Sequence, residues 1–265
     1  MENMRIHGKE PFNIAVVHGG PGARGEMYPV ARELSLDVGV LEPLQTECSV
    51  EGQVEELKEI LERSGNPPLV LIGFSWGAWL SYILTARHPL LVKKLILVSS
   101  GPFEEKYAAQ IMETRLSRLS ELEKKEALSL MFGIDLKNIN ENSFARFGEL
   151  MFKADSFDAL PPEHFTSEES PDAYIYQQVW REASKLRSTG ELLKLGASIQ
   201  CPVVAIHGNY DPHPPEGIRK PLSRVLRSFK FILLKKCGHY PWLERNVRDD
   251  FYRTLRNEIG LSANS

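Results

Sequence analysis

The chain has 265 residues, 42% hydrophobic and 25% charged, which is typical of a soluble globular protein with a large core. The net charge of −3 and the lack of any long basic run argue against nucleic acids and anionic membranes as partners. No apolar run approaches a membrane span, and the first residues lack the apolar stretch of a signal peptide, so we expect a cytoplasmic protein. Cys48, Cys201 and Cys237 form neither a metal-ligand pattern nor a disulfide framework, and we expect reduced thiols.

Apolar runs and helical patterns alternate through the first hundred residues. We expect strands at residues 12–17, 38–41, 69–72 and 93–99, and helices at 24–36, 49–64 and 78–87. The strands are apolar throughout, which predicts a mostly parallel sheet with helices on both faces. In such α/β sheets, ligands bind beyond the carboxyl ends of the strands.

The strand pattern stops at about Phe103 and resumes after Ile199. Helical patterns at 104–131, 143–153 and 173–187 fill the interval, and strands at 202–206 and 229–234 follow it with helices at 216–227 and 243–259. We therefore predict one α/β core built from residues 1–101 and 200–265, interrupted by a helical cap insertion at 102–199. An independent helical domain is the weaker interpretation, because the strand pattern resumes.

The sequence Gly73-Phe74-Ser75-Trp76-Gly77 lies between the third predicted strand and a buried helix. A serine on a sharp strand-to-helix turn presents its hydroxyl above the sheet, and the two glycines allow neighbouring backbone to approach closely. Such a turn stores about 1–3 kcal/mol of backbone strain. The pattern alone is weak evidence, but its place between a strand and a helix favours a nucleophilic serine over a simple helix-start serine.

Two further polar residues follow later strands in the order that this chemistry requires. Asp211 follows the strand at 202–206, and His239 follows the strand at 229–234. A serine hydroxyl needs a base to take its proton, and the imidazole needs a carboxylate to fix its tautomer. We therefore assign Ser75, His239 and Asp211 as a catalytic triad. The backbone N–H groups of Gly20 and Trp76 are the expected oxyanion hole, where losing one donor typically raises the barrier by about 3 kcal/mol.

Other interpretations of these residues remain open. Glu104 and Glu105, after the preceding strand, are the reserve candidates for the acid, and His213 competes with His239 as the base. A metal site at His207, Asp211 and His213 is disfavoured, because a His-Gly pair at a strand end is more simply structural. We interpret Cys237 as a packing residue and His18 as a brace for its own loop.

Aromatic side chains gather near these motifs. We expect Phe74, Tyr28, Tyr240 and Trp242 to wall a substrate pocket, with the cap as its lid. Core packing is the default role for such side chains.

Four motifs together resemble the α/β-hydrolase superfamily. They are His18-Gly19-Gly20-Pro21-Gly22, Gly73-Phe74-Ser75-Trp76-Gly77, His207-Gly208-x-x-Asp211 and Gly238-His239. The first of them, with the tryptophan after the serine, is similar to the proline iminopeptidase branch, which removes N-terminal proline from peptides. That branch has a β-hairpin before its first motif, and only thirteen residues precede Ile14, so we expect this sheet edge to be shortened or missing.

The resemblance implies acids that hold the substrate amine, for which Glu104, Glu105, Glu168 and Glu169 are the candidates in the cap. Acidic residues in a charged cap are more often a solvated face.

These patterns predict a cofactor-free serine hydrolase that cleaves an ester, thioester or amide of a small, mostly apolar molecule or short peptide. A proline iminopeptidase-like peptidase is the alternative within this class, and a C–C bond hydrolase uses the same machinery. A receptor that binds its ligand without turnover is the alternative of another class. We expect no metal, and the sequence leaves the oligomeric state open.

Overall fold

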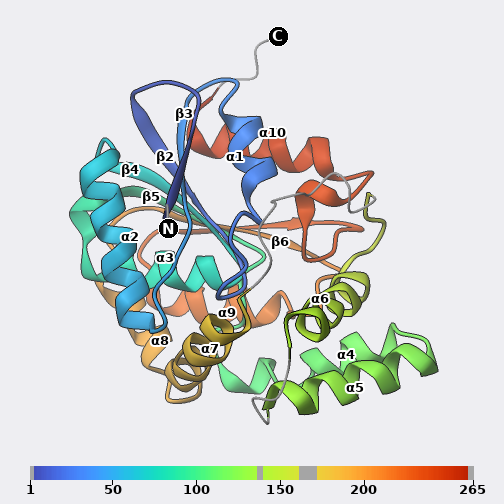
Figure 1. Ribbon diagram of the computed structural model, residues 1–265. Helices are drawn as coiled ribbons and strands as arrows, with labels where there is room; N and C mark the ends of the chain where they lie inside the picture. Colours follow the sequence, from blue (N-terminus) through green and yellow to red (C-terminus); the bar gives the residue numbers. More distant parts are fainter. Residues whose placement is uncertain (1–2, 136–139, 161–171, 262–265) are drawn as a thin grey trace.

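The computed structural model describes residues 3–135, 140–160 and 172–261, and within them the centre is a seven-stranded sheet (Figure 1). The strand order is β1-β3-β2-β4-β5-β6-β7. The strands are Met4–His7 (β1), Phe12–Val17 (β2), Gly39–Pro43 (β3), Leu69–Phe74 (β4), Val92–Val98 (β5), Val203–Gly208 (β6) and Phe229–Leu234 (β7). β1 runs antiparallel to β3, and every other neighbouring pair is parallel.

Helices cover both faces of the sheet, as the apolar strands predict. They are Tyr28–Leu34 (α1), Val50–Ser64 (α2), Trp76–Arg87 (α3), Glu216–Val225 (α9) and Arg248–Ile259 (α10). α1 and α10 pack on one face against strand residues such as Ile72. α2, α3 and α9 pack on the other face against alternate residues such as Leu71. The predicted α/β-hydrolase fold class is confirmed.

The N-terminal edge of the sheet is shortened rather than missing. β1 has four residues and pairs with β3 from Met4↔Pro43 to His7↔Val40. The sequence pattern did not predict this strand, because its side chains are mostly half-buried and show no apolar run.

The segment between β5 and β6 is helical. It contains Glu105–Tyr107 (η2), Ile111–Ser117 (α4), Glu121–Asp135 (α5), Glu141–Asp155 (α6), Ala173–Ser188 (α7), Glu191–Lys194 (α8) and Leu195–Ser198 (η4). Elsewhere in the described ranges, short 3₁₀ turns lie at Pro89–Leu91 (η1) and Pro241–Leu243 (η5).

The predicted helical pattern over 104–131 is divided among η2, α4 and α5. The chain breaks after α4, because Ser120 and Glu123 form a reciprocal cap that starts α5. The Glu123 carboxylate accepts from the Ser120 N–H at 3.0 Å, and the Ser120 hydroxyl accepts from the Glu123 N–H at 3.4 Å. The expected helix over 24–36 is also shorter, since α1 begins only at Tyr28.

The helices α5 and α6 share a small core of their own. Phe144, Phe147, Leu150 and Met151 pack there against Leu119 and Ala127. Figure 1 shows α4, α5 and α6 together at one side of the sheet, beyond the carboxyl ends of its strands. The cap insertion at residues 102–199 stays a prediction.

Hydrogen bonds join the segment that follows α6 to the loop after β7. The Glu244 carboxylate, 1% exposed, accepts hydrogen bonds from the N–H groups of Phe157 at 2.8 Å, Asp158 at 2.7 Å and Gly238 at 2.8 Å. The carbonyl of Asp155 accepts from the His239 N–H at 2.8 Å. Two segments that lie more than eighty residues apart in sequence are therefore held side by side.

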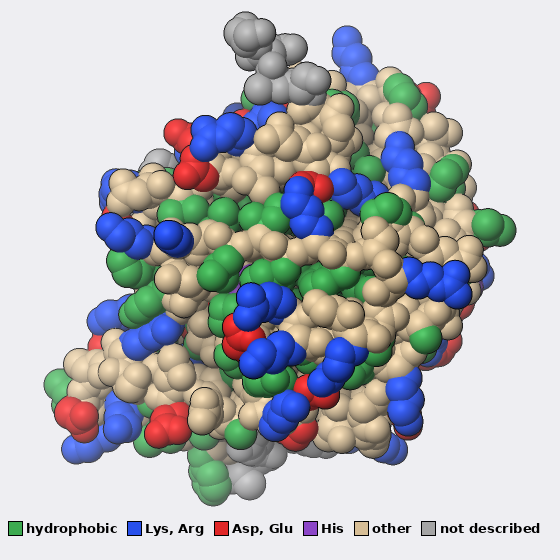
Figure 2. Space-filling view, turned by 180° about the vertical axis from the view of Figure 1, so that it is seen from behind, with side chains coloured by type: hydrophobic (Ala, Val, Ile, Leu, Met, Phe, Trp, Pro, Cys, Tyr) green, Lys and Arg blue, Asp and Glu red, His purple; other side chains and the backbone are tan. Residues whose placement is uncertain are grey.

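The face opposite to that of Figure 1 carries interspersed basic and acidic side chains (Figure 2). Ion pairs elsewhere on the molecule include Arg146–Glu126 and Arg187–Glu105. In the described part of the chain, every helix is too short or too polar to cross a membrane.

We predict that Glu244→Ala lowers the free energy of unfolding by about 3–5 kcal/mol, because three backbone N–H groups lose the buried carboxylate that accepts from them. Glu244→Gln keeps one acceptor oxygen and is expected to lose less. Urea unfolding measures both values. Glu149→Ala, at an exposed ion pair with Arg146, is the control and should stay within about 0.5 kcal/mol of the wild type. An equal stability of Glu244→Ala and this control would contradict the prediction.

Candidate active site

Ser75 lies on a strained turn between β4 and α3. Its backbone has φ 51° and ψ −112°, a conformation that L-residues with side chains rarely adopt. A Cβ on Gly73 would lie 2.2 Å from the Gly77 carbonyl oxygen, and one on Gly77 would lie 2.2 Å from the His18 carbonyl oxygen. Both glycines are therefore required by close backbone approaches, as the sequence predicted.

The structure brings Ser75, His239 and Asp211 together. Nε2 of His239 lies 3.1 Å from Oγ of Ser75, and Nδ1 of His239 lies 2.7 Å from Oδ2 of Asp211. Ser75 follows β4, Asp211 follows β6 and His239 follows β7, so the three side chains meet at the carboxyl ends of parallel strands. Asp211 is 5% exposed and His239 is 3% exposed.

The electrostatics of this chain of contacts suit a histidine base. Burial by itself lowers the pKa of His239, but the charge and hydrogen bond of Asp211 outweigh it and raise the pKa above its ordinary value. Burial by itself raises the pKa of Asp211, but His239, His213 and His207 outweigh it and hold that pKa well below its usual range. Asp211 is therefore an anion that stabilises a positive charge on His239.

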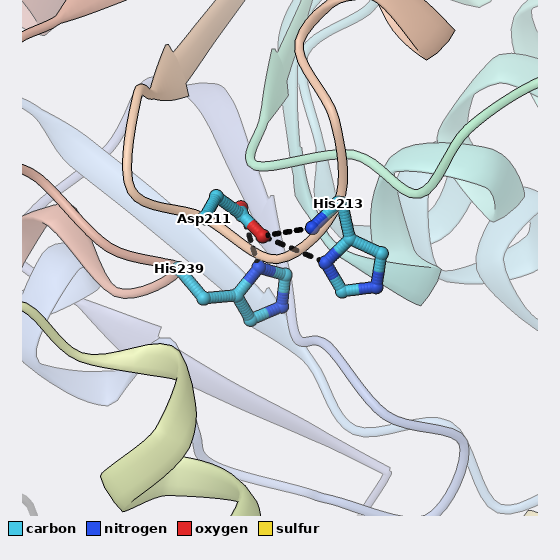
Figure 3. Close-up of side chains that lie close together, drawn as sticks. All are labelled: Asp211, His213 and His239. Atoms are coloured by element: carbon cyan, nitrogen blue, oxygen red, sulfur yellow. Dashed lines mark hydrogen bonds and ion pairs between the residues drawn. The ribbon is translucent and has the colours of Figure 1, made fainter. Parts of the chain in front are cut away.

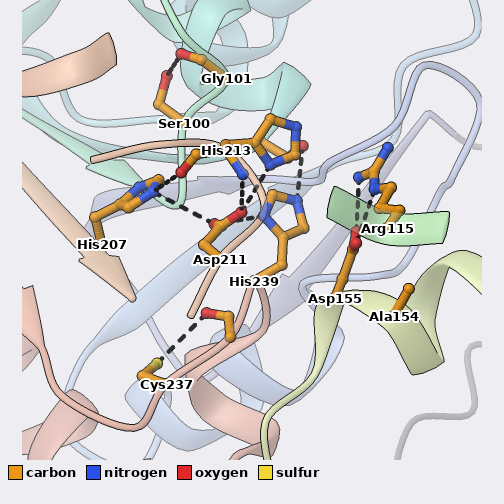
Figure 4. Close-up of polar contacts among 12 residues, drawn as sticks. Ser100, Gly101, Arg115, Ala154, Asp155, His207, Asp211, His213, Cys237 and His239 are labelled. Atoms are coloured by element: carbon orange, nitrogen blue, oxygen red, sulfur yellow. Dashed lines mark hydrogen bonds and ion pairs between the residues drawn. The ribbon is translucent and has the colours of Figure 1, made fainter. Parts of the chain in front are cut away.

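His213 contacts the other carboxylate oxygen of Asp211, Oδ1. Its backbone N–H donates to Oδ1 at 2.9 Å, and its Nδ1 lies 2.8 Å from the same oxygen (Figure 4). Burial lowers the pKa of His213 to about 4, so the ring is neutral at pH 7. His207 contacts the backbone of His213, with its Nε2 at 2.8 Å from the His213 carbonyl oxygen. His213 therefore orients the carboxylate, while His239 contacts the serine.

Asp211, His213 and His239 also form a cluster with metal-binding residue types (Figure 3). Their ligand atoms lie within 4.8 Å of one another. Both Nδ1 atoms, however, face carboxylate oxygens at 2.8 and 2.7 Å, which are hydrogen-bond distances. A metal ion would have to displace both bonds, so we interpret the cluster as a hydrogen-bonded network.

Gly20 and Trp76, whose N–H groups are the predicted oxyanion hole, lie at the cavity above Ser75. Gly20 follows β2, Trp76 opens α3, and both line the same cavity as Ser75. Across the described ranges, neither N–H donates to another backbone group. His18 braces the loop, with Nδ1 at 2.8 Å from the Gly19 carbonyl oxygen and Nε2 accepting from the Gln45 N–H at 3.3 Å. Burial lowers the pKa of His18 to about 4, so it is a neutral structural group.

A cavity of about 890 Å³ opens above Ser75. Phe74, Tyr240 and Trp242 line it, as expected, and the helices α4 and α6 contribute Met112, Phe147 and other side chains to its opposite wall. Tyr28 does not line it and is a correction to the sequence analysis. The Tyr28 ring packs instead against His7 of the edge strand, at a centroid distance of 5.5 Å, because α1 begins at Tyr28 and directs this side chain toward β1.

A family model described as "alpha/beta hydrolase fold" matches residues 14–245. The chain belongs to the α/β hydrolase fold family. This match covers most of β2, the strands β3 to β7, the helical segment and all three residues of the candidate triad. No curated protein sequence matches this α/β hydrolase.

Solved structures support the same fold. The α/β hydrolase is similar to VinJ, with 17% identity over 97% of this chain and 94% of that chain and a TM-score of 0.71. It is also similar to the 2-hydroxy-6-oxo-6-phenylhexa-2,4-dienoate hydrolase of Rhodococcus sp. strain RHA1, with 19% identity, 97% and 94% coverage and a TM-score of 0.63. MenH from S. aureus gives 17% identity, 98% coverage of both chains and a TM-score of 0.64. At these identities the likeness shows the fold.

The reserve candidates of the sequence analysis lie elsewhere in the α/β hydrolase. Glu104 pairs with Arg224 and with Lys106, and Glu105 pairs with Arg187. Cys237 is buried, and burial raises the pKa of its thiol. Glu168 and Glu169 lie outside the described residues.

The sequence analysis missed several charged residues at this site. Glu26, Arg115 and Asp155 line the cavity, and Glu244 supports the loop of His239. None of them belongs to a recognisable motif. Burial raises the pKa of Glu26 to about 7, although the charge of His239 and hydrogen bonds from Gly19 and Tyr240 favour its ionised form. The Oε2 atom of Glu26 is buried close to Gly19. A Cβ added to this glycine would lie only 2.3 Å from that oxygen.

We predict that Glu26 makes stability depend on pH. Folding raises the pKa of Glu26 from 4.5 to about 7. The contribution of the protonated side chain to the free energy of unfolding is therefore fully present below pH 4.5 and is lost as the pH rises through 7. Between pH 5 and pH 8, the wild type should lose about 2–3 kcal/mol of unfolding free energy relative to Glu26→Gln. Urea unfolding of both proteins across this range measures the difference. A difference that is independent of pH would contradict the prediction.

Proposed function

We propose that this α/β hydrolase is a serine hydrolase that cleaves an ester, thioester or amide bond through an acyl-enzyme. The observation that carries the proposal is the contact of Ser75 Oγ with His239 Nε2 at 3.1 Å, continued by the contact of His239 Nδ1 with Asp211 at 2.7 Å. The family match makes hydrolysis the expected class of reaction.

The first half of the reaction forms the acyl-enzyme. His239 takes the proton of Ser75 as the oxygen attacks the carbonyl carbon, and Asp211 stabilises the imidazolium that results. The carbonyl oxygen becomes an oxyanion, which the N–H groups of Gly20 and Trp76 would bind. When the intermediate collapses, His239 gives its proton to the leaving alcohol, thiol or amine.

The second half releases the acid. His239 takes a proton from a water molecule as that water attacks the acyl carbon, and then returns the proton to Ser75 Oγ as the bond to the enzyme breaks. These steps need only side chains of the chain and water.

The cavity favours a small, mostly apolar substrate or a short peptide. Its walls carry many aromatic and methionine side chains, including Phe74, Trp79, Phe147, Met151 and Trp180. Trp79 and Trp180 stack with their rings 5.9 Å apart and 3° from parallel, which gives one wall a flat apolar surface. Apolar surface of this kind is typical of sites that bind acyl or aromatic groups.

A proline iminopeptidase-like peptidase is the second candidate, because acidic residues face this cavity. Such an enzyme needs a carboxylate for the substrate amine, and Glu26 is an acid of the cavity wall. A C–C bond hydrolase would use the same triad, and a similar fold carries the name of a dienoate hydrolase. A ligand receptor would bind without turnover. Turnover of an ester and prolyl-amide panel separates these possibilities.

We predict that a fluorophosphonate probe labels Ser75 and that Ser75→Ala abolishes the labelling, because the probe reacts with a serine that has an adjacent base. Mass mapping of the labelled peptide identifies the site. Ser100→Ala is the matched control, since Ser100 follows the neighbouring strand and its hydroxyl donates to the Gly101 carbonyl. Absence of labelling in the folded wild type would argue against the hydrolase and favour the receptor.

We predict that the rate of this labelling rises with pH through an apparent pKa above 6.5, because His239 acts only when neutral and Asp211 raises its pKa. Asp211→Asn removes that charge and should lower both the apparent pKa and the rate, the latter by about 10³–10⁴-fold. Labelling rates between pH 5 and pH 9 measure both effects. Glu104→Gln tests the reserve acid and should leave the profile unchanged. A profile that shifts in Glu104→Gln and not in Asp211→Asn would reassign the acid.

A further inference from the structure

We infer that Arg115 is a substrate-binding residue of this cavity, and that it takes an oxygen acceptor of the substrate, a carbonyl or a carboxylate. This inference rests on the proposed hydrolase function and specifies the substrate class. The preferred substrates would carry such an oxygen on the acyl group, at a distance from the scissile bond.

Arg115 lies close to the candidate triad. It projects from α4 into the cavity that Ser75, His239 and Tyr240 also line. Its positive charge acts on the triad region, because it contributes to lowering the pKa of His213 and opposes the rise in the pKa of His239. A substrate held by Ser75 therefore lies within the electrostatic reach of this guanidinium.

Asp155 holds the guanidinium in a fixed plane. Nε of Arg115 donates to Oδ1 of Asp155 at 2.7 Å, and Nη2 donates to Oδ2 at 2.6 Å (Figure 4). Asp155 is 1% exposed, so this fork is a buried and rigid arrangement. The orientation of Arg115 is therefore set before any substrate arrives.

The remaining nitrogen, Nη1, is the unbonded end of a guanidinium that lines the cavity. Nη1 makes no hydrogen bond with any residue that the structure describes. It is also not a fully buried atom, so its N–H groups keep some exposed surface. The Arg115 side chain keeps 18% of its surface exposed. Nη1 thus offers N–H donors to whatever enters the cavity, and guanidinium donors prefer carbonyl and carboxylate oxygens.

Two other cations of the cavity wall are engaged with surface acids. Lys153 pairs with Glu123 at 2.6 Å, and Arg187 pairs with Glu105 at 2.8 Å. Their partners are 21% and 53% exposed, whereas the partner of Arg115 is buried. Among the described lining residues, Arg115 is therefore the cation best placed to meet the acyl group of a substrate.

The alternative role of Arg115 is purely structural. Asp155 is the residue whose carbonyl accepts from the His239 N–H, so the fork also anchors the loop of the histidine. A structural role predicts an equal loss of activity on every substrate. A binding role predicts a loss that depends on whether the substrate carries the acceptor.

The test compares p-nitrophenyl esters of equal chain length. The hexanoate carries no distal acceptor, the methyl adipate ester carries a carbonyl, and the adipate monoester carries a carboxylate; octanoate and suberate repeat the comparison at longer reach. We expect kcat/KM of the wild type to be about 10–100-fold higher for at least one acceptor-bearing ester than for its matched alkanoate. Ser75→Ala run in parallel corrects for uncatalysed hydrolysis. The carbonyl and carboxylate arms show which oxygen is preferred.

The double variant Arg115→Gln with Asp155→Asn leaves no unpaired buried charge, and it should reduce the preference to about threefold or less. Arg115→Lys keeps the charge without the fork and should also reduce it, which provides a second test if the double variant does not fold. Arg118→Gln is the matched control, because Arg118 donates to the Ala154 carbonyl and does not line the cavity.

A preference that is absent in the wild type, or that survives in both Arg115 variants, would overturn the inference. A lack of any Ser75-dependent ester hydrolysis would instead overturn the proposed function.

Discussion

The turn at Ser75 is the constraint on which the site depends. A residue with a side chain is held at φ 51° because the neighbouring backbone is packed too closely for any relaxation. The register of β2 against β4 pairs Val17 with Gly73, so the loops after these two strands emerge side by side. The positions of Gly20 and Trp76 near the serine therefore follow from this strand register. The strained turn and the glycine loop form one unit, set by strand register.

The position of His239 depends on both halves of the molecule. Asp211, from the sheet, fixes its ring, while the carbonyl of Asp155, at the end of α6, binds its backbone N–H. Glu244 strengthens the second attachment by joining Gly238 to the segment that follows α6. A displacement of α6 would thus move His239 relative to Ser75. The helical segment lines the cavity and also supports the position of His239.

Sequence patterns predicted the parts of the fold that depend on local signals. Buried strands, the glycine-flanked Ser75 and the order of Asp211 and His239 can each be recognised within a few residues. The contacts of Arg115 with Asp155 and of Glu244 with Phe157 join residues 40 and 87 positions apart, and no local pattern marks them. Tyr28 was misplaced for a related reason, since the start of α1 determines where its ring points. The capping box at Ser120 was a local signal that the sequence analysis overlooked.

The charges at the site leave His239 as the histidine that can gain a proton. Burial keeps His207, His213 and His18 neutral at pH 7, although two of them lie beside the Asp211 anion. The negative charge of Asp211 is therefore available to His239, the histidine that contacts the serine. Arg115 and Asp155 form an ion pair, so neither charge is left unpaired at the cavity wall. In the proposed mechanism, this arrangement stabilises the positive charge that forms on His239.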